Sequence, residues 1–347
     1  MIKEYLTTKN ITFAVLVIAL LFIIPKIIGI LLLFFGAYVI ACALVPFINK
    51  LEKKMRRGFA VTLTVFGGIL SIIAIFLPIF FVAYKEIKTF ITFLPEKLTL
   101  VTNYLMNWEF HGKKLANLFD INSIMGASST SEFAHGIFSQ SWNLTVGFFQ
   151  FLVVTVALTM IVYYILMDKT YLKSKFLEFF PANLKDKANL IIDSISRKVG
   201  GYVRAQILSM VAVGIMITVV LLMLGVDYPI LLGLIAGVMD IIPLLGPTVA
   251  LGVILLVAAP LGSVKVILAI LGFLLVQQIS NYVVRPVLFG KFMSLHPLMI
   301  FLALFAAEQF LGFWGVILSP AIAATICVLI DELYILPINN NEVVENA

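Results

Sequence analysis

Long stretches without a charged side chain are the feature that most constrains how this chain can fold. In the 347-residue sequence, 23 residues separate Lys26 from Lys50 and 35 separate Glu132 from Asp168. A charged side chain at the centre of a bilayer costs about 2.5–3.5 kcal/mol on insertion scales, so such stretches are typical of membrane spans. Only 12% of the residues are charged and 62% are apolar. Since soluble domains carry about 25% charged residues, a soluble globular fold is excluded.

The gaps between charges predict eight hydrophobic segments. The first two lie on either side of Lys26, and Pro25 shortens the first of them. Each is close to the roughly 20 residues that a helix needs to cross about 30 Å of hydrocarbon. We therefore expect an all-α polytopic membrane protein. It would have about six full transmembrane helices and two broken or re-entrant helical hairpins, with an inverted repeat in the second half.

Basic residues gather in two short segments that border hydrophobic stretches. Residues 49–57 carry five Lys or Arg against one acid, and residues 168–204 carry eight against four acids. Basic loops stay on the cytoplasmic side of a membrane, so we expect both segments and both termini there and residues 85–142 outside. Because the basic segments border spans and lack interleaved aromatics, we expect no nucleic-acid partner.

The apolar stretch between Asp227 and Lys265 is interrupted by Pro243, Gly246 and Pro247. A regular helix cannot continue there, since proline lacks an N–H and its ring crowds the preceding turn. The arm before the interruption, residues 229–242, would be only about 21 Å long and too short to span. Irregular backbone at this depth must be buried in protein or line a polar cavity, which predicts a broken helix or a re-entrant hairpin.

A second interruption follows the same pattern. Pro297 opens another short arm, Gly312 and Gly315 flank its turn, and Pro320 follows in the return arm. Corresponding interruptions in two halves of a chain point to a transport site built from an inverted repeat, here 204–260 and 266–330.

The complete expected organisation has six parts. These are N-terminal transmembrane helices 1–3 at 1–84, an extracytoplasmic amphipathic insert at 85–142, transmembrane helix 4 at 143–167, a cytoplasmic amphipathic insert at 168–203, a transport core at 204–335 with hairpins near 229–260 and 297–330, and a flexible tail at 336–347.

Several motifs of the second half occur in a fixed order and spacing: Gly201–Gln206, Asp240–Pro247, Asn281–Pro286, Leu295–Pro297 and Gly312–Gly315. Together they resemble the autoinducer-2 exporter (AI-2E) family of bacterial membrane transporters. The resemblance implies a homo-oligomeric protein of the bacterial inner membrane that moves a small polar solute outward. Some members are held to export autoinducer-2, and others to exchange Na⁺ or Li⁺ for H⁺. The chain departs from the usual motif at Ala205, where glycine is common, and at Leu244-Leu245, where Tyr-Val is common.

Asp240 and Glu308 are the strongest site candidates, because ionisable groups inside a membrane are functional candidates by default. Each adjoins an interruption, where free carbonyls and helix ends help to bind a cation and a buried carboxyl group can carry a proton. The alternative is structural: the two acids cap hairpin arms or pair with Arg285 or Arg204.

Polar side chains near these acids complete the predicted site. Gln277, Gln278 and Asn281 share one helix face, where they bind solute or hydrogen-bond to a neighbouring helix. Arg285 either reaches the cytoplasmic interface or closes a gate through Asp240 or Glu308. The expected solute or ion path comprises Asp240, Pro243, Gly246, Pro247, Gln277, Gln278, Asn281, Glu308 and Gln206. The expected gate or hinge comprises Arg285, Pro286, Pro297, Gly312, Gly315 and Pro320.

Motifs of catalysis are absent from the sequence. It contains no His-Glu-x-x-His, no Gly-x-Ser-x-Gly, no Walker loop and no cysteine cluster, and His111, His135 and His296 are scattered. We therefore expect no enzyme activity, no cofactor and no metal site. Without a nucleotide-binding domain, transport would be ion-driven or passive.

Three functions remain open from the sequence. The first is export of a small polar solute similar to autoinducer-2, and the second is exchange of Na⁺ or Li⁺ for H⁺. The third is a membrane scaffold whose inserts bind partners. The two interruptions favour transport, because a scaffold does not need irregular backbone at membrane depth.

Overall fold

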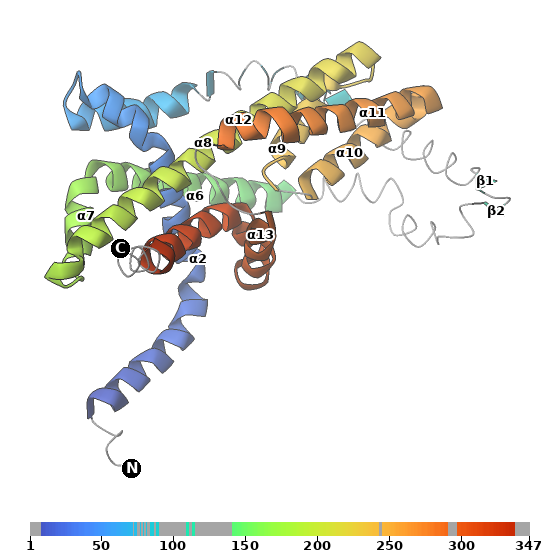
Figure 1. The fold of residues 1–347 in the computed structure, drawn as a ribbon. Coiled ribbons are helices and arrows are strands. Elements are labelled where there is room, and N and C mark those ends of the chain that lie inside the picture. Colours follow the sequence, from blue (N-terminus) through green and yellow to red (C-terminus); the bar gives the residue numbers. More distant parts are fainter. Residues whose placement is uncertain are drawn as a thin grey trace, which may run out of the picture. The chain divides into compact units, whose positions relative to one another are not determined.

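The computed structural model describes residues 8–71, scattered helical positions between 73 and 89, residues 109–110 and 113–114, and residues 141–242, 245–290 and 297–336. Within these ranges the chain is helical apart from turns and one short antiparallel pair, β1 (Glu109–Phe110) with β2 (Lys113–Lys114) (Figure 1). The predicted α-helical class is confirmed. The insert expected at 85–142 and the tail expected at 336–347 lie almost entirely outside the described residues.

The chain divides into two compact units. Unit 1 consists of residues 1–61, 157–200 and 295–347, and unit 2 of residues 62–156 and 201–294. The main helices are α2 (Thr8–Glu52), α6 (Ser141–Met167), α7 (Lys169–Leu177), α8 (Lys185–Leu224), α9 (Pro229–Met239), α10 (Leu245–Ala258), α11 (Ser263–Ile279), α12 (Arg285–Phe289) and α13 (Pro297–Ile330), with a further helix at Arg57–Ser71.

Four described helical stretches are long and apolar enough to cross a membrane: Lys26–Glu52, Ala182–Leu224, Ser263–Phe289 and Phe301–Ile335. A fifth is obtained if the helices Leu152–Met167 and Lys169–Leu177, which are bent by 74° relative to each other, form one span. These stretches agree with a multi-pass membrane protein, while the count of eight hydrophobic segments stays a prediction.

The expected break between the first two segments is wrong. Helix α2 continues for 45 residues through both Pro25 and Lys26. A proline removes one hydrogen bond from a helix, and membrane helices tolerate that loss where other groups compensate the backbone.

In unit 1, a basic side chain completes the end of α6. The Arg57 guanidinium donates from Nη2 to the Leu166 carbonyl oxygen at 2.7 Å and from Nε to the Met167 carbonyl oxygen at 3.2 Å. The last carbonyl groups of a helix have no partner within the helix, and a cation there is stabilising. One arginine of the basic segment 49–57 thus has a structural role at the end of α6.

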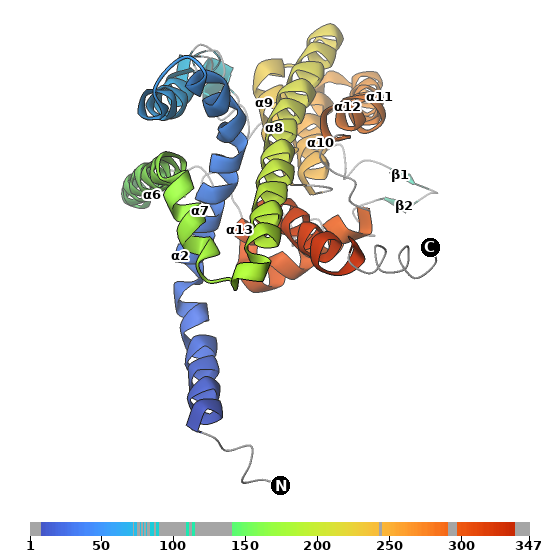
Figure 2. The same ribbon diagram turned by 60° about the vertical axis from the view of Figure 1, so that its left-hand side comes forward.

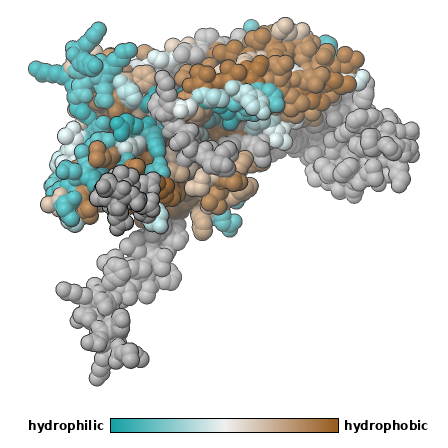
Figure 3. Space-filling view, viewed as in Figure 1, coloured by the Kyte–Doolittle hydropathy of each residue, from teal (hydrophilic) through white to brown (hydrophobic). Residues whose placement is uncertain are grey.

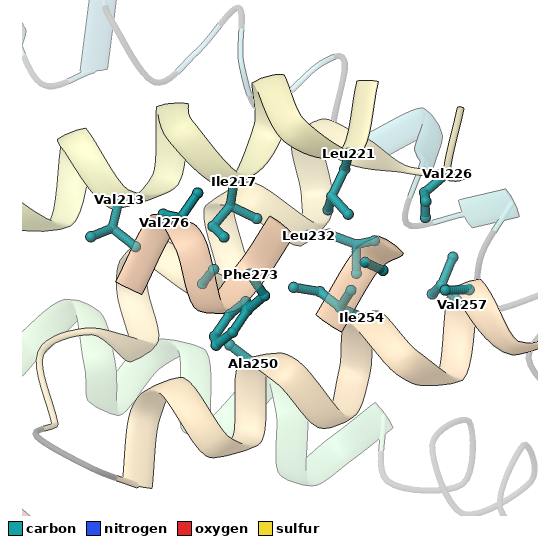
Figure 4. Packing of buried hydrophobic residues seen from close by; sticks show 13 residues of the cluster. Val213, Ile217, Leu221, Val226, Leu232, Ala250, Ile254, Val257, Phe273 and Val276 are labelled. Atoms are coloured by element: carbon teal, nitrogen blue, oxygen red, sulfur yellow. The ribbon is translucent and has the colours of Figure 1, made fainter. Parts of the chain in front are cut away.

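The core of unit 2 lies between α8, α9, α10 and α11. Val213, Ile217 and Leu221 recur every four residues on α8 and point toward Ile254 of α10 and Phe273 of α11 (Figure 4). Both ribbon views place α9–α12 beside the C-terminal half of α8 (Figures 1 and 2). Spacing of four keeps these side chains on one helix face, which is why this stripe is buried.

The opposite faces of these helices are apolar and exposed. On α11, Ile267, Leu271 and Leu275 are exposed. Hydrophobic side chains cover α11 and the C-terminal half of α8 in the space-filling view (Figure 3). A helix that is apolar on all sides is typical of a membrane span.

Helices α8 and α9 approach closely through three glycines, Gly214, Gly233 and Gly237. A Cβ atom added to Gly237 would lie 2.6 Å from the Met210 carbonyl oxygen and 3.2 Å from the Gly214 Cα, while one added to Gly233 would clash with the Thr218 hydroxyl. Two glycines four residues apart are a common motif for close packing of membrane helices. In the sequence the motif is Gly233-Leu234-Ile235-Ala236-Gly237.

Both predicted interruptions coincide with irregular backbone. Helix α9 ends at Met239 and α10 begins at Leu245. The backbone of Gly246 lies so close to the Met239 carbonyl that a Cβ atom on Gly246 would clash with it. Within α13, Gly312 leaves the helical conformation with φ 61° and ψ −152°. Only glycine adopts this backbone conformation readily.

Gly237→Ala should lower the free energy of unfolding by about 1–3 kcal/mol, because the new methyl group meets backbone atoms that cannot move aside. The measurement is the apparent melting temperature of the purified protein in detergent. The matched control is Gly252→Ala on α10, where a Cβ atom meets nothing within 4 Å. The control should keep or raise the melting temperature, since alanine favours helix by about 0.8–1 kcal/mol over glycine. Equal melting temperatures for Gly237→Ala and the parent would contradict the close α8–α9 packing.

Candidate functional site

The candidate site of unit 2 is organised around an ion pair at the first helix break. Asp240 is the C-cap residue directly after α9, and Arg285 is the first residue of α12. Arg285 Nη2 lies 2.8 Å from Asp240 Oδ1, the Asp240 side chain is fully buried and that of Arg285 is 32% exposed. Of the alternatives for Asp240, the structure therefore contains the pairing with Arg285.

One face of α8 supplies the other partners of Asp240. Ser209 Oγ donates to Asp240 Oδ2 at 3.2 Å, and Gln206 Nε2 donates to the Asp240 carbonyl oxygen at 3.0 Å. Tyr202 OH in turn donates to Gln206 Oε1 at 3.4 Å. These three residues are spaced by four and three positions, so they lie on the same side of the helix. Both carboxylate oxygens of Asp240 are thus hydrogen-bonded.

A π-helical segment, Ser280–Val284, joins α11 to α12 immediately before Arg285. The Arg285 backbone N–H donates to the Ser280 carbonyl oxygen, five residues earlier. Single π-helical turns occur frequently at functional sites, because the extra residue changes the direction of the following side chains. Here the side chain that follows is the guanidinium paired with Asp240.

The other end of α9 is held by an acidic residue from far away in the sequence. The Leu231 N–H in the first turn of α9 donates to Glu86 Oε2 at 2.7 Å. A carboxylate at a helix N-terminus satisfies a free N–H and interacts favourably with the helix dipole. Tyr228, just before α9, has φ 56°. Burial and the carboxylates of Asp227 and Glu86 raise the pKa of the Tyr228 hydroxyl.

The structure brings together three of the predicted site residues: Asp240, Arg285 and Gln206. Gly246 and Pro247 lie in the first turn of α10, and Pro243 lies outside the described residues. Gln277 is half-buried, whereas Gln278, Asn281 and Pro286 are exposed.

The remaining candidates belong to unit 1 and are described by themselves. Glu308 is exposed on α13, four residues before the interruption at Gly312. Pro297 is the first residue of α13, while Gly315 and Pro320 are buried within it. Gly315 packs so closely on the Ala307 carbonyl that a Cβ atom there would clash.

Four contributing residues were missed by the sequence reasoning: Tyr202, Ser209, Ser280 and Glu86. Ser209 and Ser280 are fully buried, and each lies in an apolar helix three residues after a glutamine. That spacing was the available signal, since residues three apart share a helix face. Glu86 gave no such signal, because its partner lies 145 residues away.

The chemistry of the site is that of an electrically neutral polar cluster. The carboxylate of Asp240 is balanced by Arg285, which offsets the cost of burying an isolated charge. Among the described residues, no three His, Cys, Asp or Glu side chains are grouped so that they could hold a metal ion. The arrangement is suited to hydrogen bonding with a polar solute.

A second group of charges, in unit 1, connects the basic insert to the end of α13. Lys173 Nζ lies 2.7 Å from Asp193 Oδ1, and Lys198 Nζ lies 3.2 Å from Asp331 Oδ2. All four side chains are partly exposed, so each pair contributes only about 0–1 kcal/mol. They position α7, α8 and the C-terminal segment rather than form a binding site.

Comparison with known proteins gives a family and several relatives. A family model described as "AI-2E family transporter" matches residues 11–335. The chain is 25% identical over 52% of its length to "Putative transport protein YrrI" of Bacillus subtilis, covering 51% of that protein. It is 24% identical to "Putative transport protein MJ1177" of Methanocaldococcus jannaschii, covering 90% of this chain and 91% of that protein.

A "Sodium-lithium/proton antiporter" of Halobacillus andaensis is 26% identical over 49% of this chain and 47% of that protein. The matched part thus spans about half the length of the first and third of these relatives.

Arg285→Gln should lower the free energy of unfolding by about 3 kcal/mol, because it leaves the buried Asp240 carboxylate without a counter-charge. Asp240→Asn should cost less, since Arg285 is partly exposed and can reach water or lipid headgroups. The double variant Asp240→Asn/Arg285→Gln should recover part of the loss.

Apparent melting temperatures in detergent measure the stability of all three variants. Lys175→Gln, which breaks an exposed pair with Glu178, is the control and should change stability by about 0.5 kcal/mol or less. Additive losses in the double variant would contradict the pairing.

Proposed function

The chain belongs to the AI-2E transporter family, and from that premise we propose that it is a secondary transporter that exports a small polar solute similar to autoinducer-2. The proposed location is the bacterial inner membrane, with both termini in the cytoplasm and several copies of the chain in one assembly. The driving force is an ion gradient or the solute gradient itself.

The observation that carries this proposal is the polar cluster at the break between α9 and α10. The ion pair of the buried Asp240 with Arg285 lies between largely apolar helices, together with three further hydrogen-bonding side chains, Gln206, Ser209 and Tyr202. Polar groups of this kind are expensive inside a membrane and mark solute or ion pathways. Short helices that meet at irregular backbone are the usual setting of such a site.

The ion pair also suggests how access to the site is controlled. Asp240 belongs to the break of the hairpin and Arg285 to the helix that follows α11. Separating the two exposes both charges, so the pair favours one arrangement of these elements. We propose that the pair stays closed while solute is bound and opens only when these elements move, and that the predicted gate and hinge residues, from Arg285 to Pro320, accommodate that movement.

The alternative proposal is exchange of Na⁺ or Li⁺ for H⁺. Two observations favour it: a relative is named a sodium-lithium/proton antiporter, and Asp240 is a buried carboxyl group. In that reading Asp240 alternates between a proton and a cation, and Glu308 is a second candidate carrier. The two proposals share the same helices and differ in what binds at the break.

Efflux from liposomes tests the proposed export. The purified chain is reconstituted into liposomes loaded with autoinducer-2, and the initial rate of loss is measured against protein-free liposomes. Asp240→Asn should reduce this rate about tenfold or more, since hydrogen bonds to a charged group contribute about 1.5–3 kcal/mol and 1.4 kcal/mol corresponds to tenfold.

Asp193→Asn is the matched control, because it makes the same chemical change in an exposed pair of unit 1 and should leave efflux unchanged. A pH-sensitive dye enclosed in the same liposomes separates the two proposals. Proton movement on adding sodium, without efflux of autoinducer-2, would replace export by cation exchange. Equal efflux from the parent and Asp240→Asn would exclude the break as the site.

A further inference from the structure

Two buried polar atoms beside the ion pair lack a hydrogen-bond partner among the described residues. They are Ser280 Oγ and Arg285 Nε. Ser280 is fully buried. Buried polar groups are almost always hydrogen-bonded, because leaving one unpaired is unfavourable. Two such atoms on one short segment therefore need an explanation.

Ser280 is the first residue of the π-helical segment and Arg285 is the residue that follows it. The Arg285 backbone N–H bonds to the Ser280 carbonyl, which brings the two residues together along the helix axis. Arg285 also reaches Asp240, so its side chain extends toward the break after α9. Ser280 is buried one turn earlier. One unpaired atom thus belongs to the guanidinium of the ion pair, and the other to the residue that is bonded to Arg285 through the backbone.

The charges and donors of the cluster define which ligand it suits. Each oxygen of the Asp240 carboxylate already accepts a hydrogen bond, one from Arg285 and one from Ser209. The groups left over are an N–H donor of a guanidinium and a hydroxyl, which both donates and accepts. A cation would face that N–H donor and the positive charge behind it. An uncharged molecule with acceptor oxygens meets no such penalty.

We propose that Ser280 and Arg285 hydrogen-bond directly to the transported solute, and that this solute is an uncharged molecule with hydroxyl or carbonyl oxygens. Arg285 Nη2 stays on Asp240 while its Nε–H donates to a solute oxygen, and the Ser280 hydroxyl binds a second oxygen. The inference rests on the proposed export and adds the contact groups and the charge of the solute.

Two measurements on Ser280→Ala test this inference. The first is the concentration of autoinducer-2 inside the liposomes that gives half-maximal efflux, which should rise about 3- to 10-fold when one hydrogen bond is lost. The second is the rise in apparent melting temperature that autoinducer-2 produces in the detergent-purified protein, which should be largely lost. Without solute, Ser280→Ala should melt at or above the parent temperature, because it removes an unpaired hydroxyl. A structural role for Ser280 would instead lower it.

Arg285→Lys gives an independent second variant. Lysine keeps the positive charge for Asp240 but has a single nitrogen, so it cannot serve Asp240 and the solute in the same geometry. It should also raise the half-maximal concentration. The matched control is Ser319→Ala, a fully buried serine whose hydroxyl already donates to the Val316 carbonyl at 2.8 Å. It should leave the half-maximal concentration and the solute-induced shift unchanged.

The outcomes separate this inference from the proposed function. Normal efflux by the parent with an unchanged half-maximal concentration in Ser280→Ala overturns the inference and leaves export standing. No efflux of autoinducer-2 by the parent overturns both. A melting shift on adding sodium chloride but none with autoinducer-2 also overturns the inference, since the site then binds a cation.

Discussion

A carboxylate at a break in a membrane helix must be neutralised and hydrogen-bonded, and the pairing of Asp240 with Arg285 meets that requirement. The free backbone groups at the end of α9 and the charge of Asp240 would both be costly in hydrocarbon. Arg285 supplies the counter-charge, Ser209 binds the second carboxylate oxygen, and Gln206 binds the Asp240 carbonyl. Three helices, α8, α9 and α12, are thereby tied to one residue. This cluster holds the turn between α9 and α10, and Glu86 holds the N-terminal end of α9.

Because lipid is as apolar as a leucine side chain, the hydrophobic effect does not drive these helices together. Close contact must do so, and glycines at the α8–α9 contact allow it. Gly233 and Gly237 bring the α9 backbone against Gly214, while larger side chains such as Ile254 and Phe273 fill the space between α8, α10 and α11. The exposed apolar faces are then left for lipid. The short helix α9 is held by close contacts and hydrogen bonds. It can therefore move if only these local contacts rearrange.

Charge spacing and proline placement were enough to predict the helical class and the break after Asp240. They also gave the pairing of Asp240 with an arginine as one of two alternatives. These features depend on single residues with large energetic effects, namely a charge in hydrocarbon or a missing N–H. The continuity of α2 through Pro25 was not predictable in this way, because compensation by other groups decides it. The exposure of Glu308 and the contact of Glu86 with α9 depend on tertiary packing, which hydropathy does not encode. Ser280 becomes informative only once its burial without a partner is seen.

The neutrality of the cluster bears on which proposal is physically simpler. For a cation to replace Arg285 on Asp240, the carboxylate must lose its 2.8 Å contact with the guanidinium. That loss is unfavourable, because the Asp240 carboxylate is fully buried and the cation must replace both a charge and a hydrogen bond. Binding of an uncharged solute needs no such separation, because Ser280 and Arg285 Nε have free capacity while the pair stays intact. This difference favours export of a polar, uncharged solute, with the ion pair intact while solute is bound rather than acting as the carrier.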